Sequence, residues 1–484
     1  MNKTKKGKLK KLPGIILGLI ALIAAAVFSA TVISTQMLST LYIGLVIAAC
    51  AVATLIAFCL LVTDPRRHKV RFSFGVIWLV LCIAVYSVAG VLISNTQNTL
   101  RQIADSSGES VNVSFYVKAE DPATTLEEAR DYTFGILASL DRENTDAALS
   151  AVEEQQGFTL QIREYNGLTQ LADALLDGEV GGIVLNEGYV DVYDEIPNYT
   201  DFADQIRALQ SESLEQTQNE NAPSSTAADD GVINIYISGS DTRESTLPVR
   251  GRSDVNIIAS VNLNTHKVLL LSTPRDYYVP LSISGGARDK LTHAGIYGVQ
   301  VSMDTLEMLY DMDIDYYFRI NFTGFEKIVD ALGGIEVYSD IAFDSRGAHF
   351  ELGINHLNGE EALIYCRERY AYADGDRHRG QNQMDVIKAI AEKAVSPSIL
   401  KNYLSVLDGL QDYMETSVPY DLIAQVVQDQ LSGNPQWDIT SYSVDGTGDY
   451  AVPYSMSVRA YVMVPDTSAV EEAKSLLAQI AQGD

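Results

Sequence analysis

Cysteine is scarce in this sequence, and its distribution excludes a disulfide framework. Of the four cysteines in 484 residues, Cys50, Cys59 and Cys82 lie inside long apolar runs near the N-terminus. Cys366 is the one cysteine in the remaining part, so no intrachain disulfide can form there. We expect that part to be stabilised by its core alone, even in an oxidising compartment outside the cell.

Positive charge is also scarce. The chain has 35 Lys and Arg against 63 Asp and Glu, and its net charge is −28. Residues 1–71 carry ten Lys and Arg and one Asp, a net charge of +9, so the remainder carries −37. A part of the chain this acidic repels nucleic acids and anionic lipid surfaces, so we expect no nucleic-acid partner. An anionic substrate must find a local cationic pocket in it.

Long uncharged runs, in contrast, occur three times, at residues 12–34, 37–62 and 72–94. Each exceeds the roughly 20 residues that cross the hydrocarbon core of a bilayer. The first run is too long for the apolar core of a cleaved signal peptide, and two more runs follow it. The sequence therefore predicts three transmembrane helices within residues 12–94.

The orientation of these spans follows from the placement of Lys and Arg. Six lysines lie in residues 1–11, and four basic residues lie in the loop at 63–71, so both segments are expected in the cytoplasm. The link near Thr35 and Gln36 is uncharged and is expected outside. Three spans then place everything after Asn95 outside the cell membrane.

Residues 95–210 are predicted to form a small α/β accessory domain outside the membrane. A polar stalk at 95–110 comes first, and no catalytic constellation is evident among the scattered acidic residues. Apolar alternation and helical spacing give its elements. Strands are expected at 111–118, 158–165 and 182–185, and helices at 124–140 and 168–176.

Residues 211–230 have almost no large apolar side chain and are predicted to be a flexible linker. Strands and helices alternate in residues 231–484, which predicts a layered α/β/α domain with a central mixed sheet. Strands are expected at 232–238, 255–261, 268–272, 314–320, 335–338, 437–444 and 458–462. Helices are expected at 292–310, 324–331, 360–369, 383–395, 399–414, 420–431 and from about Thr467.

Polar clusters follow several of these elements, where loops often carry function. These clusters have ordinary explanations: an Asx turn at Asp241, a surface ion pair of Arg252 with Asp254, an i,i+3 pair of Asp376 with Arg379, and a solvated helix end at Arg367 and Arg369. The clusters are GSDTR at 239–243, RSD at 252–254, TPRD at 273–276, and a last group holding Arg367, Arg369, Asp376, Arg379 and Gln383.

Taken together, the clusters predict a pyrophosphate site. The guanidinium fork of arginine donates two parallel hydrogen bonds to paired phosphate oxygens. Six arginines recur at element ends in an otherwise acidic domain. Magnesium typically takes one or two carboxylates and completes its shell with phosphate oxygens and water, and Asp241 and Asp254 suit that need.

Seven blocks follow one another over about 160 residues, within 232–395. They are the GSDTR, RSD and TPRD clusters, then DKLTHAGIYGV, IDYYFRINFTGFEKIVDALGGIEV, LNGEEALIYCRERY and GDRHRGQNQ. In this order they resemble the LytR-CpsA-Psr family of cell-envelope glycopolymer ligases. Three spans and an accessory domain resemble its capsule-associated branch.

The resemblance implies roles for individual residues. Asp241 and Asp254 would hold Mg²⁺ or Mn²⁺, and the family fold places a lipid tail in an apolar tunnel that residues 314–337 could line. Asp376 and Gln383 would orient the arginines, while the general base stays open between Asp276 and the metal-bound aspartates. The pyrophosphate would contact Arg243, Arg252, Arg275, Arg367, Arg369, Arg379 and Gln383, and the catalytic group would be Arg275, Asp276, Arg367, Arg369 and Asp376.

The chain departs from the family pattern at two positions. The usual Asp-x-x-Arg-x-x-Arg-Gln ends here in Asn382-Gln383, which removes one cation. The usual Ile-Pro-Arg-Asp begins here with Thr273, which leaves the charged pair intact. The first change leaves one phosphate or supporting contact without its usual cation.

The implied activity is a phosphotransfer that attaches a polyprenyl-pyrophosphate-linked glycopolymer, such as capsule or teichoic acid, to peptidoglycan and releases polyprenyl phosphate. Two alternatives remain. One is a regulatory membrane protein of the transcription-attenuator type that binds lipid-linked glycan without chemistry. The other is a polyprenyl-pyrophosphate hydrolase, with water in place of the glycan acceptor.

Overall fold

The computed structural model describes residues 12–35, 40–63, 67–104, 110–215, 231–241, 247, 251–372, 376–394 and 413–483. The chain divides into two compact units. Of the described residues, the first holds the N-terminal helices with residues 418–436, and the second holds the rest, including both sheets described below.

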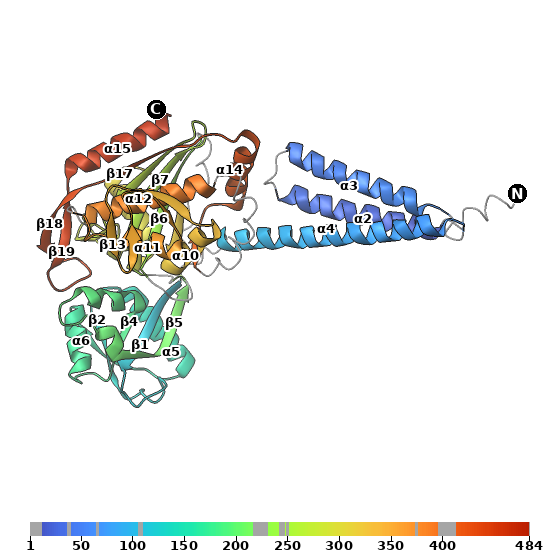
Figure 1. Cartoon of the computed structure of the whole chain (residues 1–484). Helices are drawn as coiled ribbons and strands as arrows, with labels where there is room; N and C mark the ends of the chain where they lie inside the picture. Colours follow the sequence, from blue (N-terminus) through green and yellow to red (C-terminus); the bar gives the residue numbers. More distant parts are fainter. Residues whose placement is uncertain are drawn as a thin grey trace. The chain divides into compact units, whose positions relative to one another are not determined.

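The first unit contains three helices that are long and apolar enough to cross a membrane. They are α2 (Leu12–Ser34), α3 (Thr40–Leu61) and α4 (Lys69–Ala104), which pack side by side (Figure 1). The expected spans are confirmed as helices, and membrane anchoring follows. Helix α4 continues through residues 95–104, where a polar stalk was expected.

Small residues allow these helices to approach closely. A Cβ atom at Gly14 would lie 1.9 Å from the carbonyl oxygen of Leu61, and one at Gly18 would lie 2.6 Å from the ring of Phe58. The indole Nε1 of Trp78 donates to the carbonyl of Ala53 at 3.0 Å. Close backbone packing of this kind is typical of helix pairs in bilayers.

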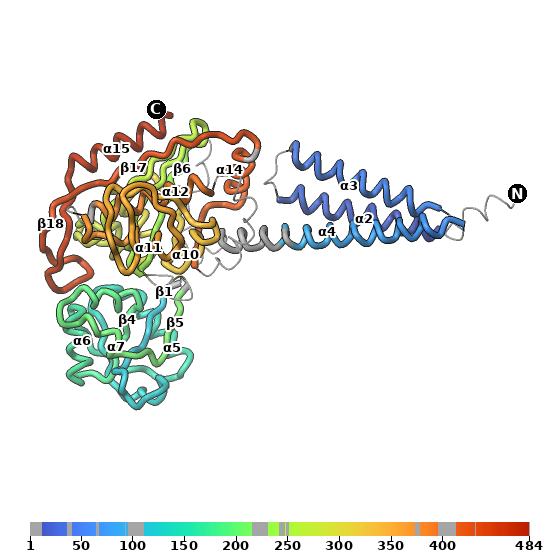
Figure 2. Tube along the Cα trace, in the orientation of Figure 1, coloured from blue at the N-terminus to red at the C-terminus, as the bar shows by residue number. Residues whose placement is uncertain are grey.

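The accessory part of the second unit is built on a five-stranded sheet in the order β3-β2-β4-β1-β5. Figure 2 shows the path of the chain through this part, including β1, β4 and β5. Strand β1 runs antiparallel to β4 and β5, while β2 runs parallel to β3 and β4. The strands are β1 (Ser110–Lys118), β2 (Thr133–Leu137), β3 (Gln161–Tyr165), β4 (Gly182–Asn186) and β5 (Ile206–Glu215). The helices are α5 (Arg142–Gln156), α6 (Leu168–Leu176), η1 (Glu187–Glu195) and α7 (Phe202–Gln205).

Two predictions for this part are wrong. The helix expected at 124–140 is a series of turns followed by strand β2, because Phe134 and Ile136 are fully buried in the sheet. A short apolar run of this kind does not distinguish helix from strand by periodicity. Strand β5 extends to Glu215, into the segment expected to be linker, and residues 216–230 lie outside the described part.

The larger part has a six-stranded mixed sheet in the order β16-β11-β6-β7-β8-β17. Strands β6, β7 and β8 are antiparallel neighbours, whereas β11 runs parallel to β6 and β17 runs parallel to β8. The strands are β6 (Val232–Ser240), β7 (Val255–Asn262), β8 (Lys267–Thr273), β11 (Tyr316–Asn321), β16 (Met414–Thr416) and β17 (Asp438–Ser443).

Helices cover both faces of this sheet, as the side-chain alternation of its central strand requires. Ile258 faces a cluster that includes Leu306 and Leu477, and its neighbour Ile257 faces the opposite cluster, which includes Met384. The predicted layered α/β/α fold with a central mixed sheet is therefore confirmed. The covering helices are α9 (Val299–Tyr310), α10 (Phe322–Ala331), α11 (Gly359–Arg367), α12 (Asp376–Ala394) and α15 (Thr467–Gln482).

This part also contains short pairs of antiparallel strands, and one of its predicted helices is interrupted. Residues 292–310 form α8 (Leu291–Ala294), η2 (Gly295–Tyr297) and α9, broken at Gly298, whose φ of 116° is outside helical space. Most of the helix expected at 399–414 lies outside the described residues. The antiparallel pairs are β9 (Tyr278–Pro280) with β10 (Arg288–Lys290), β12 (Ile335–Ser339) with β15 (Gly353–Leu357), β13 (Phe343–Ser345) with β14 (Ala348–Phe350), and β18 (Gly446–Ala451) with β19 (Ala460–Pro465).

The accessory part and the larger part share one hydrophobic core. This core joins Leu171, Tyr189 and Tyr193 of the accessory part to Ile296 and Tyr297 of the larger part. The rings of Tyr189 and Tyr297 meet edge to face, with centroids 6.0 Å apart. The two parts therefore form a continuous apolar interior, and residues of either can support a site in the other.

Candidate functional site

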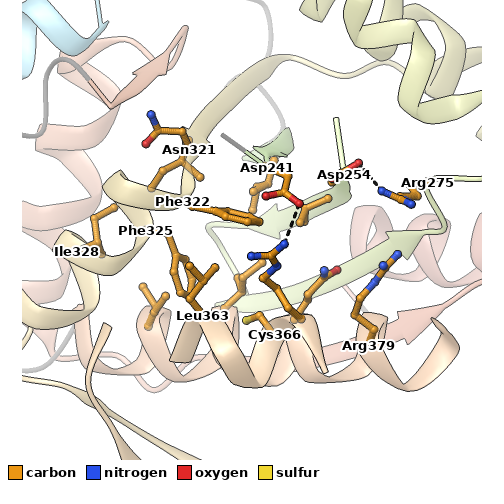
Figure 3. A pocket seen from close by; sticks show the side chains of 18 of the residues that line it. Asp241, Asp254, Arg275, Asn321, Phe322, Phe325, Ile328, Leu363, Cys366 and Arg379 are labelled. Atoms are coloured by element: carbon orange, nitrogen blue, oxygen red, sulfur yellow. Dashed lines mark hydrogen bonds and ion pairs between the residues drawn. The ribbon is translucent and has the colours of Figure 1, made fainter. Parts of the chain in front are cut away.

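A cavity of about 440 Å³ opens at one edge of the large sheet. Strands β6, β7 and β11 supply one wall, and helices α10, α11 and α12 supply the other. Figure 3 shows side chains from both walls directed into the same space. The residues that line it include Asp241, Asp254, Arg275, Arg346, Arg367, Arg369, Arg379 and Gln383 among the polar ones, and Phe318, Ile320, Phe322, Phe325, Ile328, Leu363, Ile387, Ile390 and Ala391 among the apolar ones.

The two ends of the cavity differ in chemistry. Phe325 and Ile328 lie at one end in Figure 3, and Asp254, Arg275 and Arg379 lie at the other. Residues of β11 and α10 form much of the apolar wall, within the range 314–337 that was expected to line a lipid tunnel. Apolar walls with a few convergent polar groups are typical of ligand sites.

The pairing of β6 with β7 brings the two candidate metal-binding aspartates to one edge. Gly239 of β6 faces Val255 of β7, and the amide of Asp254 donates to the carbonyl of Gly239 at 2.8 Å. Asp241 directly follows the end of β6, and Asp254 directly precedes the start of β7. A Cβ atom at Gly239 would lie 2.9 Å from that of Val255, so glycine permits the close approach.

Asp241 forms an ion pair across the cavity with Arg367 at the end of α11. The Nη2 atom of Arg367 lies 2.9 Å from Oδ2 of Asp241, and its guanidinium lies 4.6 Å above the ring of Phe322. Burial raises the pKa of Asp241, and the nearby Asp254 carboxylate acts in the same direction against Arg367. A buried carboxylate beside a second carboxylate is a suitable place for a cation.

Arg275 forms a second ion pair, with Asp254. Its Nη1 atom lies 2.9 Å from Oδ1 of Asp254, and its Nε atom lies 3.6 Å from Asp276. Burial lowers the pKa of Arg275, but the carboxylates of Asp254 and Asp276 outweigh this effect and raise it. The guanidinium therefore stays charged at the polar end of the cavity.

Helix α12 and the end of α11 complete the cationic side. Arg379 and Gln383 are four residues apart on one face of α12, and both line the cavity. Arg369 also lines it and donates to the hydroxyl of Tyr370 at 2.7 Å. Asn382 is 1% exposed and donates to the carbonyl of Tyr365, so it lies away from the cavity.

Seven of the predicted site residues are thus brought together in one cavity, and their roles with substrate stay predictions. Two others do not line it. Asp276 is buried, within 3.2 Å of Lys290, and Arg252 pairs with Glu195 of the accessory part at 3.0 Å. Arg243 and the side chain of Asp376 lie outside the described residues.

Sequence reasoning missed some polar residues at and behind the cavity. Arg346 lines it from the turn between β13 and β14, with a φ of 48°. Its only local signal is the following Gly347, which is typical of a tight turn. Lys290 and His293 were quoted within a family block without a role, and both are buried behind the site. Glu195 had no local signal.

The donor set fits a magnesium ion better than a metal that needs a protein cage. Among the described residues, no group of three or more His, Cys, Asp and Glu side chains is placed to hold a metal. Asp241 and Asp254 supply two carboxylates, and both line the cavity. Magnesium accepts such a pair when phosphate oxygens and water complete its octahedron.

The chain is similar to several known proteins. The chain is 35% identical over 213 residues to "Polyisoprenyl-teichoic acid--peptidoglycan teichoic acid transferase TagU" of Enterococcus faecalis, covering 42% of this chain and 70% of that protein. It is 34% identical over 224 residues to TagU of Oceanobacillus iheyensis, covering 45% and 68%. A crystal structure of B. subtilis TagV is similar over 52% of this chain and 98% of its own, with 26% identity and a TM-score of 0.44.

The family comparison covers the cavity and both of its walls. The LytR_cpsA_psr family model matches residues 199–478, which is more than half of the chain. All the described cavity residues fall within that range. The predicted family is confirmed: the chain belongs to the LytR-CpsA-Psr family.

Proposed function

We propose that this protein transfers a glycopolymer from a polyprenyl-pyrophosphate carrier to peptidoglycan and releases polyprenyl phosphate. The observation that carries the proposal is the two-ended cavity. Its apolar end, with Phe325 and Ile328, suits a prenyl tail, and its charged end, with Arg275 and Arg367, suits a pyrophosphate. The teichoic acid transferases to which the chain is similar support this choice of reaction.

The reaction is a single displacement at phosphorus. A hydroxyl oxygen of a peptidoglycan sugar attacks the sugar-proximal phosphorus and forms a new P–O bond. The P–O bond to polyprenyl phosphate breaks, and the hydroxyl proton leaves to a base. Arg275, Arg367, Arg369 and Arg379 would hold the phosphate oxygens, so catalysis is mainly positioning and neutralisation of charge.

A magnesium ion is part of the proposal. Asp241 and Asp254 would hold it, and when bound it would neutralise charge on the pyrophosphate oxygens. Each of these carboxylates also pairs with an arginine, at 2.9 Å in both cases. Those pairs keep the arginines extended into the cavity, where phosphate oxygens would meet them.

The proposal places the cavity outside the cytoplasm. The basic residues at 1–11 and 63–71 flank the apolar helices on one side of the membrane by sequence. With three spans, the second unit then lies on the opposite side, where peptidoglycan is found. The acidic charge of that part, −37 after residue 71, also keeps it away from anionic lipid headgroups.

The test uses the full-length protein in nanodiscs with a polyprenyl-pyrophosphoryl oligosaccharide, peptidoglycan fragments and Mg²⁺. Released polyprenyl phosphate and sugar-bearing peptidoglycan are measured together. Equal yields of both products are expected from the wild type, and Arg275→Ala should lose most of both. Arg130→Ala is the matched control, because Arg130 is an exposed arginine of the accessory part.

The same assay separates the alternatives. Polyprenyl phosphate release that is independent of peptidoglycan would identify a hydrolase and contradict the transfer. Binding of the donor without any covalent product would contradict catalysis and favour a regulatory protein.

A further inference from the structure

Glu195 of the accessory part reaches the back of the proposed transfer site. It is the last residue of η1, and its neighbours Tyr193 and Ile196 are buried in the core that both parts share. The side chain of Glu195 is 12% exposed. Its backbone is therefore anchored on both sides, and its carboxylate is held in a defined place.

Both carboxylate oxygens of Glu195 bind cations of the larger part. Oε1 accepts from Nη1 of Arg252 at 3.0 Å, and Oε2 accepts from Nζ of Lys290 at 2.5 Å. The Nε2 atom of His293 lies 3.8 Å from Oε2. These are charge-assisted contacts, which are stronger than neutral hydrogen bonds.

The network continues from these cations to the cavity. Lys290 lies 3.2 Å from Asp276, Asp276 lies 3.6 Å from Arg275, and Arg275 lies 2.9 Å from Asp254. Arg252 is two residues before Asp254 in the chain. Glu195 is thus linked to a candidate metal ligand by a continuous series of ion pairs.

The largely buried charges of this network balance when Glu195 is present; Asp194, which is 49% exposed and lies 4.0 Å from Arg252, stands outside this count. With His293 protonated, its four cations are Arg252, Arg275, Lys290 and His293, and its four carboxylates are Glu195, Asp254, Asp276 and Asp289. Without Glu195, Arg252 and Lys290 would lose their nearest carboxylate and would compete for Asp254 and Asp276. An uncompensated buried charge is strongly unfavourable, so the remaining side chains would rearrange.

We infer that Glu195 is a positioning residue of the transfer site: it fixes Arg252 and Lys290 so that Asp254 and Arg275 are directed at the pyrophosphate. This inference rests on the proposed function for its substrate. It gives the accessory part a defined role, which is to supply the carboxylate that completes the charge network of the site.

The test measures affinity for a pyrophosphate lipid separately from transfer. Full-length wild type, Glu195→Gln, Glu195→Asp and the neighbouring control Asp194→Asn are titrated with geranylgeranyl pyrophosphate and Mg²⁺ in nanodiscs. Asp194 is a suitable control because its side chain is 49% exposed and reaches Arg252 only at 4.0 Å. Near-ultraviolet circular dichroism establishes that each variant is folded.

We expect Glu195→Gln to bind about tenfold more weakly, Asp194→Asn to stay within twofold of wild type, and Glu195→Asp to recover part of the loss because it keeps the charge. Arg252→Gln and the double variant, Glu195→Gln with Arg252→Gln, complete a double-mutant cycle. If Glu195 acts through Arg252, the double variant loses no more than the weaker-binding single variant. Full additivity, or wild-type affinity of Glu195→Gln, would overturn the inference.

Two further outcomes keep the inference separate from the proposed function. If Glu195→Gln does not fold, Arg252→Gln tests the same contact from its other side, and wild-type affinity there would overturn the inference. If the wild type binds the lipid but transfers nothing, the proposed function fails while the binding series still decides the role of Glu195. If transfer proceeds and Glu195→Gln has unchanged kcat and KM, only the inference fails.

Discussion

The Nη2 atom of Arg367 lies 2.9 Å from the Oδ2 atom of Asp241, although 126 residues separate them in the chain. Arg367 ends helix α11, and Asp241 follows strand β6. Both residues line the cavity, so their contact places a cation beside a carboxylate within it.

Replacing Arg367 with alanine should lower kcat/KM for glycopolymer transfer about tenfold to hundredfold, because a charge-assisted contact contributes about 1.5–3 kcal/mol. The measurement is the initial rate of polyprenyl phosphate release over a range of donor concentrations. Arg130→Ala should keep the wild-type value. Equal rates for Arg367→Ala and the wild type would remove Arg367 from the site.

Asp254→Asn should raise the Mg²⁺ concentration needed for half-maximal transfer about tenfold or more, since it removes one charged ligand of the proposed ion. The measurement is transfer rate against Mg²⁺ concentration. Asp131→Asn, at a side chain that is 91% exposed in the accessory part, is the control. An unchanged Mg²⁺ dependence in Asp254→Asn would show that the ion, if required, binds elsewhere.

Filling the apolar end of the cavity should weaken the binding of donors with long tails and leave the binding of donors with short tails unchanged. Ile328→Trp adds a ring where Ile328 lines the apolar wall, so a long-chain donor should lose about tenfold in affinity because its tail no longer fits. A pyrophosphate with a five-carbon tail should bind as it does to the wild type. Met308→Trp, on an exposed position, is the control, and equal losses for both tail lengths would contradict the prediction.

The stability of the second unit should fall as pH rises above neutrality. Burial opposes protonation of His293, but Asp289 and Glu195 outweigh burial and raise its pKa from 6.5 to about 9. Its Nδ1 atom lies 2.7 Å from Asp289, and Lys290 also contacts Glu195. Because the folded-state pKa is the higher one, the stabilisation is complete below pH 6.5 and is lost as pH rises through 9, and it amounts to at most about 3 kcal/mol.

Thermal unfolding of the wild type and of His293→Gln between pH 6 and pH 9.5 checks this dependence. The difference in melting temperature between the two proteins should shrink as pH rises. A difference that stays constant over this range would show that His293 is not held in its charged form by its two carboxylates.

Much of the fold and part of the site could be predicted from local signals. The long uncharged runs predict α2 and α3, because length and apolar composition are enough to identify a helix that can cross a membrane. The pattern of apolar residues at β6–β8 predicts a buried sheet. Asp241, Asp254 and Arg275 each stand directly beside such a strand, so their convergence followed from the sheet. Loops next to buried strands are well placed to carry function.

Other features depend on contacts between distant segments. Residues 133–137 form strand β2 because β3 and β4 flank them, and the sequence in that window does not reveal those neighbours. Arg252 was expected on the pyrophosphate, but its guanidinium pairs with Glu195, 57 residues earlier in the chain. Glu195 itself is one of many scattered acidic residues in the sequence, and only its contacts with Arg252 and Lys290 in the folded chain distinguish it.

The most direct test of the proposed reaction follows one phosphorus atom. A donor labelled with ³²P at the sugar-proximal phosphate is incubated with the full-length protein, peptidoglycan fragments and Mg²⁺, and the label is located after separation of the products. Attack at that phosphorus predicts that all transferred label is found in peptidoglycan and that released polyprenyl phosphate carries none. Label in polyprenyl phosphate, or in free glycan phosphate independent of acceptor, would contradict the transfer.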